Sequence, residues 1–327
     1  MSRFSRRQIL CLAGFGPVAP AMAQLIGKGS GGWSIRGTEP IEVFHGDRRV
    51  TSYRTGYESI VPRFEPVVGP TGKACISVGQ PKEVTSKHWP GGLGFALGNV
   101  NGYRFLPGVS EGQEEIPLLK RGLILHRGMN GVLIKDSAVV MRVKSEWVDA
   151  EDPVRRIASD RREITLFHRE DGSLALSLSL ELMADAGDLE LGVDETGGWM
   201  VGLVPGMAWK KEEREEPVFR NREGLRNSEA QKAGSNWVVC QGLDAGGTAA
   251  GVAVLDHPGN PGSPARWTLD GEGVLSAHPF SSEGAAKTMP VLVPNGESVF
   301  FRYRTIFFEG EVPDEEVVKA YEAFAQR

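Results

Sequence analysis

The sequence predicts a mostly β protein: a large antiparallel β-sandwich, of jelly-roll or supersandwich type, with a short C-terminal helix. Three observations predict this fold class. Leucines alternate with small or polar residues in one long run, and short apolar segments recur along the chain between turns rich in Gly and Pro. Helical periodicity is clear only at the C-terminus.

The clearest strand pair spans residues 164–182. In its second half apolar residues alternate with small or polar ones, which is the pattern of a strand with one buried face. Asp171-Gly172 separates the halves, and the glycine supplies the positive φ that a tight hairpin turn needs. Leucines occupy the expected buried face at positions 174, 176, 178, 180 and 182.

Further strands are expected where runs of β-branched and aromatic residues stand between turns. These runs are Val132–Ile134, Val139–Val143, Trp199–Val204, Trp237–Cys240, Ala250–Leu255, Pro290–Val293 and Val299–Phe308. The glycine-rich segment 87–102 is too irregular to predict a regular strand.

One helix is expected at the C-terminus. Pro313 followed by three acidic residues is typical of a first helical turn, where the helix dipole favours negative charge. Apolar residues then fall on one helical face, which we expect to dock on the sheet: Val317, Val318, Tyr321 and Phe324. Residues 24–327 are expected to form a single β-sandwich domain with a charged loop near 208–236, either a solvated loop or the rim of a site.

Residues 1–23 predict a twin-arginine signal peptide. Arg6-Arg7 precede a weakly apolar run that ends Ala21-Met22-Ala23, a small-x-small cleavage pattern. That run is shorter than a spanning helix needs and carries Pro17 and Pro20. The prediction is a periplasmic or secreted protein with no membrane span in the mature chain.

Charge and cysteine content limit the partners. Without residues 1–23 the chain has 34 basic and 42 acidic residues, a net charge of −8. That balance argues against nucleic acid as a partner. Only Cys75 and Cys240 remain, and two buried free thiols are favoured over a disulfide.

The sequence contains no phosphate-binding glycine loop and no Cys-x-x-Cys, His-Glu-x-x-His or Gly-x-Ser-x-Gly motif. The side chains that could take part in catalysis or binding lie in three local sequences. The first runs from Lys87 to Gly102 and holds His88, Trp89, Asn99 and Asn101. The second, 255–267, holds Asp256, His257, Asn260 and Trp267 after an apolar strand. The third ends at His126, and His278-Pro279 repeats the His-Pro pair of the second.

These segments resemble the PmoA-like proteins of unknown function, often labelled "methane oxygenase PmoA". The resemblance covers about residues 62–310 and rests on a set of short matches: Asn99–Gly102, Glu146-Trp147, Arg161–Thr165, Asp194–Trp199, Gly224–Ser228, Trp237 and, most specifically, Ala250–Pro261 with Trp267. The resemblance implies an exported protein with a β-sandwich-like fold. It also implies a carbohydrate-related role, because such proteins are often found in polysaccharide-degrading bacteria.

The chain also departs from that family. Members carry an Asp-His-Pro-His-His-like cluster where this sequence has a single histidine, His88. Ser263-Pro264 stands where the family often has His-Pro. These losses weaken any inherited metal site or acid–base chemistry.

The site prediction assigns catalysis to His257, His88, Asp256 and Glu146, since histidine titrates near neutral pH and two carboxylates can support glycoside hydrolysis. The predicted substrate-binding residues are Asn99, Asn101, Trp89, Trp147, His126, Asn260 and Trp267. Each has a structural alternative: turn capping for the asparagines and core packing for the tryptophans. No metal site is predicted, and the cofactor stays open.

Two functions follow from these residues. One is a carbohydrate-active enzyme, of hydrolase, lyase or epimerase type, in which His257, His88 and a carboxylate meet in one pocket. The other is a non-catalytic glycan-binding or structural envelope protein, with an open groove lined by Trp89, Trp147 or Trp267. In both, the expected partner is a small carbohydrate or glycan fragment.

Overall fold

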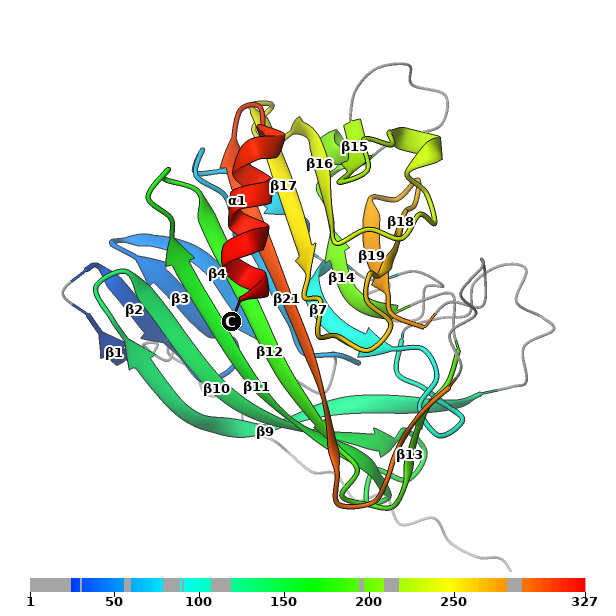
Figure 1. Ribbon diagram of the computed structural model, residues 1–327. Helices are drawn as coiled ribbons and strands as arrows, with labels where there is room; N and C mark the ends of the chain where they lie inside the picture. Colours follow the sequence, from blue (N-terminus) through cyan, green and yellow to red (C-terminus); the bar gives the residue numbers. More distant parts are fainter. Residues whose placement is uncertain are drawn as a thin grey trace, which may run out of the picture.

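The computed structural model describes residues 25–29, 31–55, 60–78, 89, 91–106, 119–193, 197–208, 218–280 and 290–326. Figure 1 shows two large sheets, with helix α1 lying against one of them. The predicted signal peptide and His88 lie outside the described residues. No described helix is long and apolar enough to cross a membrane.

The first sheet has ten strands, nine of them in the order β1-β2-β3-β4-β5-β7-β14-β19-β18, with β6 added beside β5. Its strands are β1 (Leu25–Lys28), β2 (Trp33–Arg36), β3 (Ile41–His45), β4 (Arg48–Arg54), β5 (Arg63–Val68), β6 (Ala74–Ile76), β7 (Gly92–Leu97), β14 (Gly197–Gly202), β18 (Arg266–Leu269) and β19 (Val274–His278). Every neighbouring pair in it is antiparallel.

The second sheet has nine strands in the order β15-β16-β17-β21-β12-β11-β10-β9-β8. Its strands are β8 (Tyr103–Arg104), β9 (Lys120–Ile134), β10 (Ala138–Asp149), β11 (Arg156–His168), β12 (Leu174–Met183), β15 (Val218–Asn221), β16 (Trp237–Leu243), β17 (Ala249–Asp256) and β21 (Ser298–Glu309). A small third sheet pairs β13 (Leu189–Leu191) with β20 (Val291–Val293). Short 3-10 turns η2 (Pro205–Met207) and η3 (Asn227–Glu229) complete the elements with α1.

Aromatic rings pack the two large sheets together. Phe95 of β7 lies 4.9 Å from Phe301 of β21, and Trp199 of β14 stacks on Tyr303 at 5.9 Å. Trp199 also donates to the Thr305 hydroxyl across the interface, at 2.9 Å. Large aromatic side chains contribute most of the apolar area that such a core removes from water. The predicted mostly β sandwich is confirmed.

The predicted hairpin is also confirmed. β11 and β12 pair in register from Ser159 opposite Met183 to His168 opposite Leu174. Gly172 has a φ of 81°, as the turn requires. The alternating leucines are all buried, because side chains two residues apart point to the same face of a strand.

Helix α1 spans Asp314–Ala325 and buries Val317, Tyr321 and Phe324. It packs on the face of the nine-stranded sheet that points away from the ten-stranded one, against Trp237, Leu255 and Ile306 among others. The helix therefore covers the sheet as expected.

Two expectations about irregular segments were wrong. The glycine-rich run contains the regular strand β7, buried along its whole length, because neighbouring chain lies against its glycines. The charged segment 208–236 is not one loop: residues 209–217 lie outside the described part, but the stretch 218–236 contains β15 and η3.

The two cysteines are free and buried, as predicted. Burial raises the pKa of the Cys75 thiol to about 12, and burial also raises the pKa of Cys240. Both thiols are therefore structural side chains rather than nucleophiles.

Candidate functional site

Asp256 and His257 point to opposite faces of the nine-stranded sheet, because they are adjacent residues at the end of β17. Asp256 lies on the inner side, where the Asn260 side chain and the Ala265 amide donate to its carboxylate. His257 lies on the outer side, edge-on to Phe324 of α1 at 5.3 Å. The two side chains do not share a pocket.

Asp256 is almost fully buried, and burial raises the pKa of its carboxyl to about 6. Burial lowers the pKa of His257, and the Arg302 charge lowers it further. The His257 ring accepts the Gly259 amide at Nδ1, while its Nε2 has no hydrogen-bond partner among the described residues. His257 is therefore held neutral beneath the helix.

The Asn260 side chain connects the end of β17 to β21 by hydrogen bonds. Its side-chain oxygen accepts the Arg302 amide at 2.7 Å, and its nitrogen donates to both the Arg302 carbonyl and Asp256. All the hydrogen-bonding atoms of this side chain are engaged with protein, so the geometry gives Asn260 a structural task.

His126 lies in mid-strand on β9, facing Tyr53 of the other sheet at 5.9 Å between ring centres. Burial, followed by the Arg162 charge, lowers its pKa. Its Nδ1 and the hydroxyl of its cross-strand neighbour Ser145 have no partner among the described residues. His126 belongs to a polar group between the sheets, apart from the end of β17.

Glu146 faces solvent on β10, where it pairs with Arg127 at 2.7 Å. Three strands separate β10 from β17, which places their backbones about 19 Å apart. Among the described residues, the predicted catalytic carboxylate and His257 therefore do not converge, and the single-pocket arrangement needs correction.

The predicted asparagines shape turns. Asn101 has a φ of 50°, accepts the Glu190 amide at 2.6 Å and donates to the Asp188 carbonyl at 2.9 Å. Asn99 accepts the Gly102 amide. Both fit the turn-forming alternative.

The tryptophans do not line an open groove. Trp147 and Trp267 are completely buried, and their indole nitrogens donate to Asp160 and to the Ser235 carbonyl. They offer no free ring face, which corrects their assignment to sugar binding. Trp89 is 8% exposed and lies on the other side of the ten-stranded sheet.

That side of the ten-stranded sheet has an unusual composition. Strands β5, β7, β14 and β19 lie next to one another and are buried along nearly all their length. Their inner face is apolar, with Phe64, Leu93, Phe95, Trp199 and Leu275. Their outer face, which we call the polar face, carries Arg63, Glu65, Gly92, Gly94, Ala96, Gly198, Met200, Gly202, Val274, Ser276 and His278.

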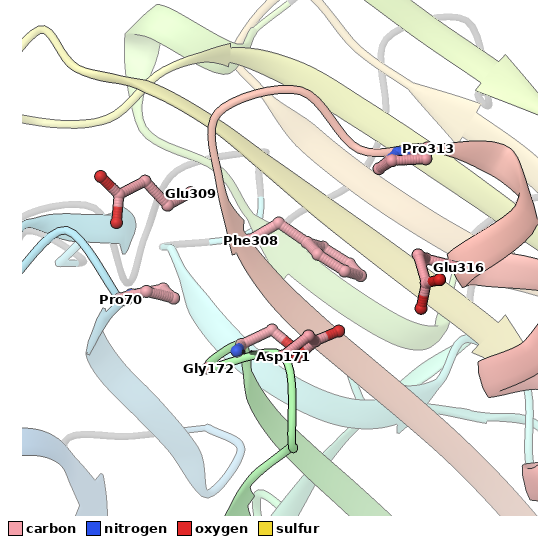
Figure 2. Close-up of a pocket in the computed structure, with 8 residues that line it drawn as sticks. Pro70, Asp171, Gly172, Phe308, Glu309, Pro313 and Glu316 are labelled. Carbon is pink, nitrogen blue, oxygen red and sulfur yellow. Dashed lines mark hydrogen bonds between the residues drawn. The ribbon is translucent and has the colours of Figure 1, made fainter.

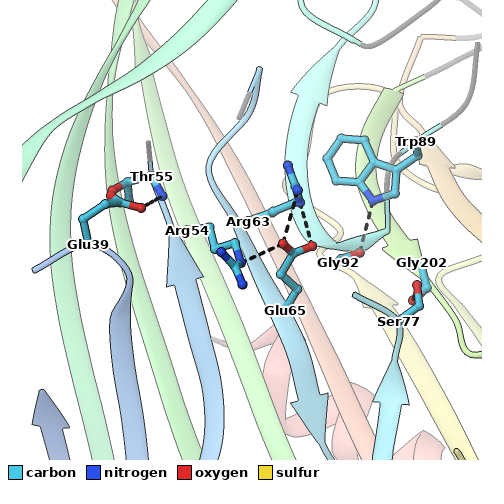
Figure 3. Close-up of polar contacts among 9 residues, drawn as sticks. All are labelled: Glu39, Arg54, Thr55, Arg63, Glu65, Ser77, Trp89, Gly92 and Gly202. Atoms are coloured by element: carbon cyan, nitrogen blue, oxygen red, sulfur yellow. Dashed lines mark hydrogen bonds and ion pairs between the residues drawn. The ribbon is translucent and has the colours of Figure 1, made fainter. Parts of the chain in front are cut away.

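The charged part of the polar face is a triad of Arg54, Glu65 and Arg63 (Figure 3). Arg63 donates to both Glu65 oxygens, at 2.8 and 3.2 Å, and Arg54 Nε lies 2.9 Å from the same carboxylate. The side chains of Arg63 and Glu65 are 8% and 2% exposed, whereas that of Arg54 is 46% exposed. Burying such charges costs several kcal/mol per ion before pairing.

Trp89 covers the middle of this face. Its indole nitrogen donates to the Gly92 carbonyl at 3.1 Å (Figure 3). A Cβ at Gly94 would lie 3.2 Å from the Trp89 ring, and Gly94 is the cross-strand partner of Arg63. The glycines of β7 thus leave room for an aromatic ring beside the triad.

His278 and Thr268 stand at the far end of the polar face, with the imidazole Nε2 2.6 Å from the threonine hydroxyl. Of the predicted residues that the structure describes, only Trp89 lies on this face. Sequence reasoning missed Arg63 and Glu65, although their alternation with Phe64 gives a strand with one charged and one apolar side.

A separate surface pocket of about 230 Å³ lies under the start of α1 (Figure 2). It is bordered by the hairpin turn at Asp171 and Gly172, by Phe308 and by Glu316. None of the predicted site residues lines it. The described residues also contain no group of three or more His, Cys, Asp or Glu side chains arranged to hold a metal ion.

A family model described as a family of unknown function (DUF6807) matches residues 40–322. The chain belongs to this family. The DUF6807 match contains every residue of the polar face and of the triad. Its description does not mention PmoA, so that part of the sequence resemblance stays a prediction.

No curated protein matches the chain. Among solved structures, it is similar to a GalM/aldose epimerase homologue from C. elegans, with 8% identity and a TM-score of 0.30. The similarity covers 88% of this chain and 100% of that one. A TM-score of 0.30 does not establish a shared fold or function for this DUF6807 protein.

Proposed function

We propose that this protein is an exported glycan-binding protein that holds a carbohydrate fragment on the polar face of its ten-stranded sheet. The observation that carries the proposal is the contrast between the two buried faces of β5, β7, β14 and β19. One is an apolar core. The other buries charged, hydroxyl and imidazole groups over a row of glycines.

Such a face is poorly explained by stability. Replacing a buried ion pair with apolar side chains of similar volume is often neutral or stabilising. Guanidinium, carboxylate, hydroxyl and imidazole groups are the donors and acceptors that a polyhydroxylated ligand needs.

The triad favours binding over acid–base catalysis. Both Glu65 oxygens already accept hydrogen bonds from guanidinium groups. A carboxylate engaged in this way orients the arginines. The enzyme hypothesis loses its predicted pocket, because Glu146, Asp256 and His257 lie apart.

Export remains part of the proposal, on the strength of the Arg6-Arg7 pair and the Ala21-Met22-Ala23 pattern. Fusing residues 1–30 to a reporter that is active only after folded export tests it. We expect export with the native pair and none with the Arg6→Lys, Arg7→Lys double variant. Equal export of both reporters would contradict the twin-arginine route.

Binding is tested by titrating the chain from residue 24 against a panel of plant, algal and bacterial oligosaccharides by calorimetry. Arg63→Gln should weaken binding of any ligand found by at least about tenfold, because it removes a charge-assisted donor. Arg142→Gln is the matched control, since Arg142 forms a solvent-exposed pair with Glu163 at 2.8 Å. A ligand bound equally by both variants, or turned over into products, would contradict the proposal.

A further inference from the structure

Three polar side chains meet between the two large sheets, on the side of β4 that faces the core. Tyr53 comes from β4 of the ten-stranded sheet, and His126 and Ser145 come from β9 and β10 of the other sheet. The rings of Tyr53 and His126 stand nearly perpendicular, with 5.9 Å between their centres. Ser145 is the cross-strand partner of His126, so these two side chains are neighbours on one face. We call the three residues the inter-sheet group.

Each member of the inter-sheet group has a buried polar atom without a hydrogen-bond partner among the described residues. These atoms are the Tyr53 hydroxyl, Nδ1 of His126 and the Ser145 hydroxyl. Tyr53 and Ser145 are each only 1% exposed. An unsatisfied buried donor or acceptor destabilises a fold, and native proteins rarely keep one without compensation.

The buried charges nearby do not supply the missing partners. Asp160 is the other cross-strand partner of Ser145, but its carboxylate accepts hydrogen bonds from Arg162 and Trp147 instead. Burial raises the pKa of the Tyr53 hydroxyl to about 12, and burial followed by the Arg162 charge lowers the pKa of His126. The inter-sheet group therefore offers two neutral hydroxyls and a neutral imidazole.

Water has the chemistry that these three groups need. A water molecule can donate two hydrogen bonds and accept two, so it suits hydroxyls and an imidazole nitrogen whichever of them donates. Buried waters typically make about three hydrogen bonds to otherwise unsatisfied polar groups. Polar groups that face one another without a direct bond are often bridged in this way. A metal ion would lack ligands, because the described residues hold no suitable group of three His, Cys, Asp or Glu side chains.

We infer that an ordered water molecule is bound between the two sheets, where it bridges the Tyr53 hydroxyl, the Ser145 hydroxyl and Nδ1 of His126. The water connects β4 of one sheet to β9 and β10 of the other. The inference does not depend on the proposed function. It gives His126, predicted from the sequence to bind substrate, a part in the contact between the sheets.

A high-resolution crystal structure of the protein tests the site directly. We expect a water peak within hydrogen-bond distance of all three atoms. Three outcomes would overturn the inference: no peak at this position, direct hydrogen bonds among the three side chains, or density for a larger molecule.

Thermal unfolding gives an independent test. Ser145→Ala should lower the midpoint by about 2 °C or more, because it removes a satisfied buried hydrogen bond. If no water is bound, the same variant removes an unsatisfied hydroxyl, and the midpoint should stay the same or rise. Ser179→Ala is the matched control, since Ser179 is a half-buried serine of β12 on the opposite face of the same sheet, and it should leave the midpoint nearly unchanged.

A double variant tests whether the two hydroxyls share one water. Tyr53→Phe alone should also lower the midpoint. Because the bridge is already broken in Ser145→Ala, the double variant should lose less than the sum of the two single losses. Strictly additive losses, or a raised midpoint for either single variant, would overturn the inference.

Discussion

The indole nitrogen of Trp147 donates a 2.7 Å hydrogen bond to the carboxylate of Asp160, completely buried between the two sheets. The same carboxylate receives two hydrogen bonds from the Arg162 Nε and one at 2.7 Å from its terminal nitrogen. The ring of Trp147 fills the core, while its one polar atom helps to satisfy a buried ion pair. A residue predicted to stack on sugar is thus part of the framework.

Trp147→Phe should destabilise the fold by about 2–4 kcal/mol, because it removes a donor from a buried charge and leaves space in the core. Urea unfolding followed by circular dichroism measures the change. Trp89→Phe is the matched control, because its indole donates to a neutral carbonyl near the surface. A smaller loss for Trp147→Phe than for Trp89→Phe would contradict the account.

Asp160→Asn should cost about 3–5 kcal/mol, because Arg162 would keep its charge in the core without a counter-charge. Glu163→Asn, on the same strand but facing solvent, should change the free energy of unfolding by less than about 1 kcal/mol. Urea unfolding measures both changes. Similar losses for the two variants would contradict the claim that the Asp160–Arg162 pair contributes more to stability than a solvent-exposed pair.

Asp256 predicts a pH dependence with a definite sign. Its pKa is raised from 3.8 to about 6 by burial, so the folded state binds a proton that the unfolded state has released. This contribution to stability is complete below pH 3.8 and is lost as pH rises through 6. Between pH 3 and 7 wild type should therefore lose about 3 kcal/mol relative to Asp256→Asn. A difference that stays constant across this range would contradict burial of the carboxyl.

His257 predicts the opposite sign. Its folded pKa is lowered by burial and by Arg302, so its contribution is present above the unfolded pKa of 6.5 and is lost as pH falls below it. His257→Gln should make unfolding less sensitive to acid below pH 6.5. Urea unfolding at several pH values measures this, and an acid sensitivity equal to that of wild type would argue against a neutral His257 under α1.

Gly94→Ala should destabilise the polar face by about 1–3 kcal/mol, because a Cβ would lie 3.1 Å from the Pro62 carbonyl and 3.2 Å from the Trp89 ring. Gly131→Ala is the control, since its Cβ would meet nothing within 4 Å. Thermal unfolding should show a lower midpoint for Gly94→Ala alone. Equal midpoints for Gly94→Ala and Gly131→Ala would show that the packing of Trp89 does not require glycine at position 94.

Sequence alone could predict the strands whose apolar residues alternate with polar ones, such as β12, and the acidic start of α1. It could not predict β7, because Gly92 and Gly94 are explained by the Trp89 ring and the Arg63 side chain that lie against them in space. It also placed Asp256 and His257 together by adjacency, whereas the alternation of a strand sends adjacent side chains to opposite faces.

The triad was missed for a related reason. Arg54 and Glu65 lie on different strands, and their pairing depends on the register of β4 with β5. A local motif search sees Arg63 and Glu65 only as two charges in a strand. Which buried face of a sheet packs into the core and which carries charged side chains becomes visible only when the strand order is known.

Hydrogen exchange measured with and without a bound glycan tests the central claim most directly. The account predicts that ligand slows exchange of backbone amides in β5, β7 and β14 and near Arg54, and leaves the segment from Asp256 to Asn260 unchanged. Protection confined to Asp256–Asn260, or spread over the outer face of the nine-stranded sheet, would contradict the polar face as the binding site.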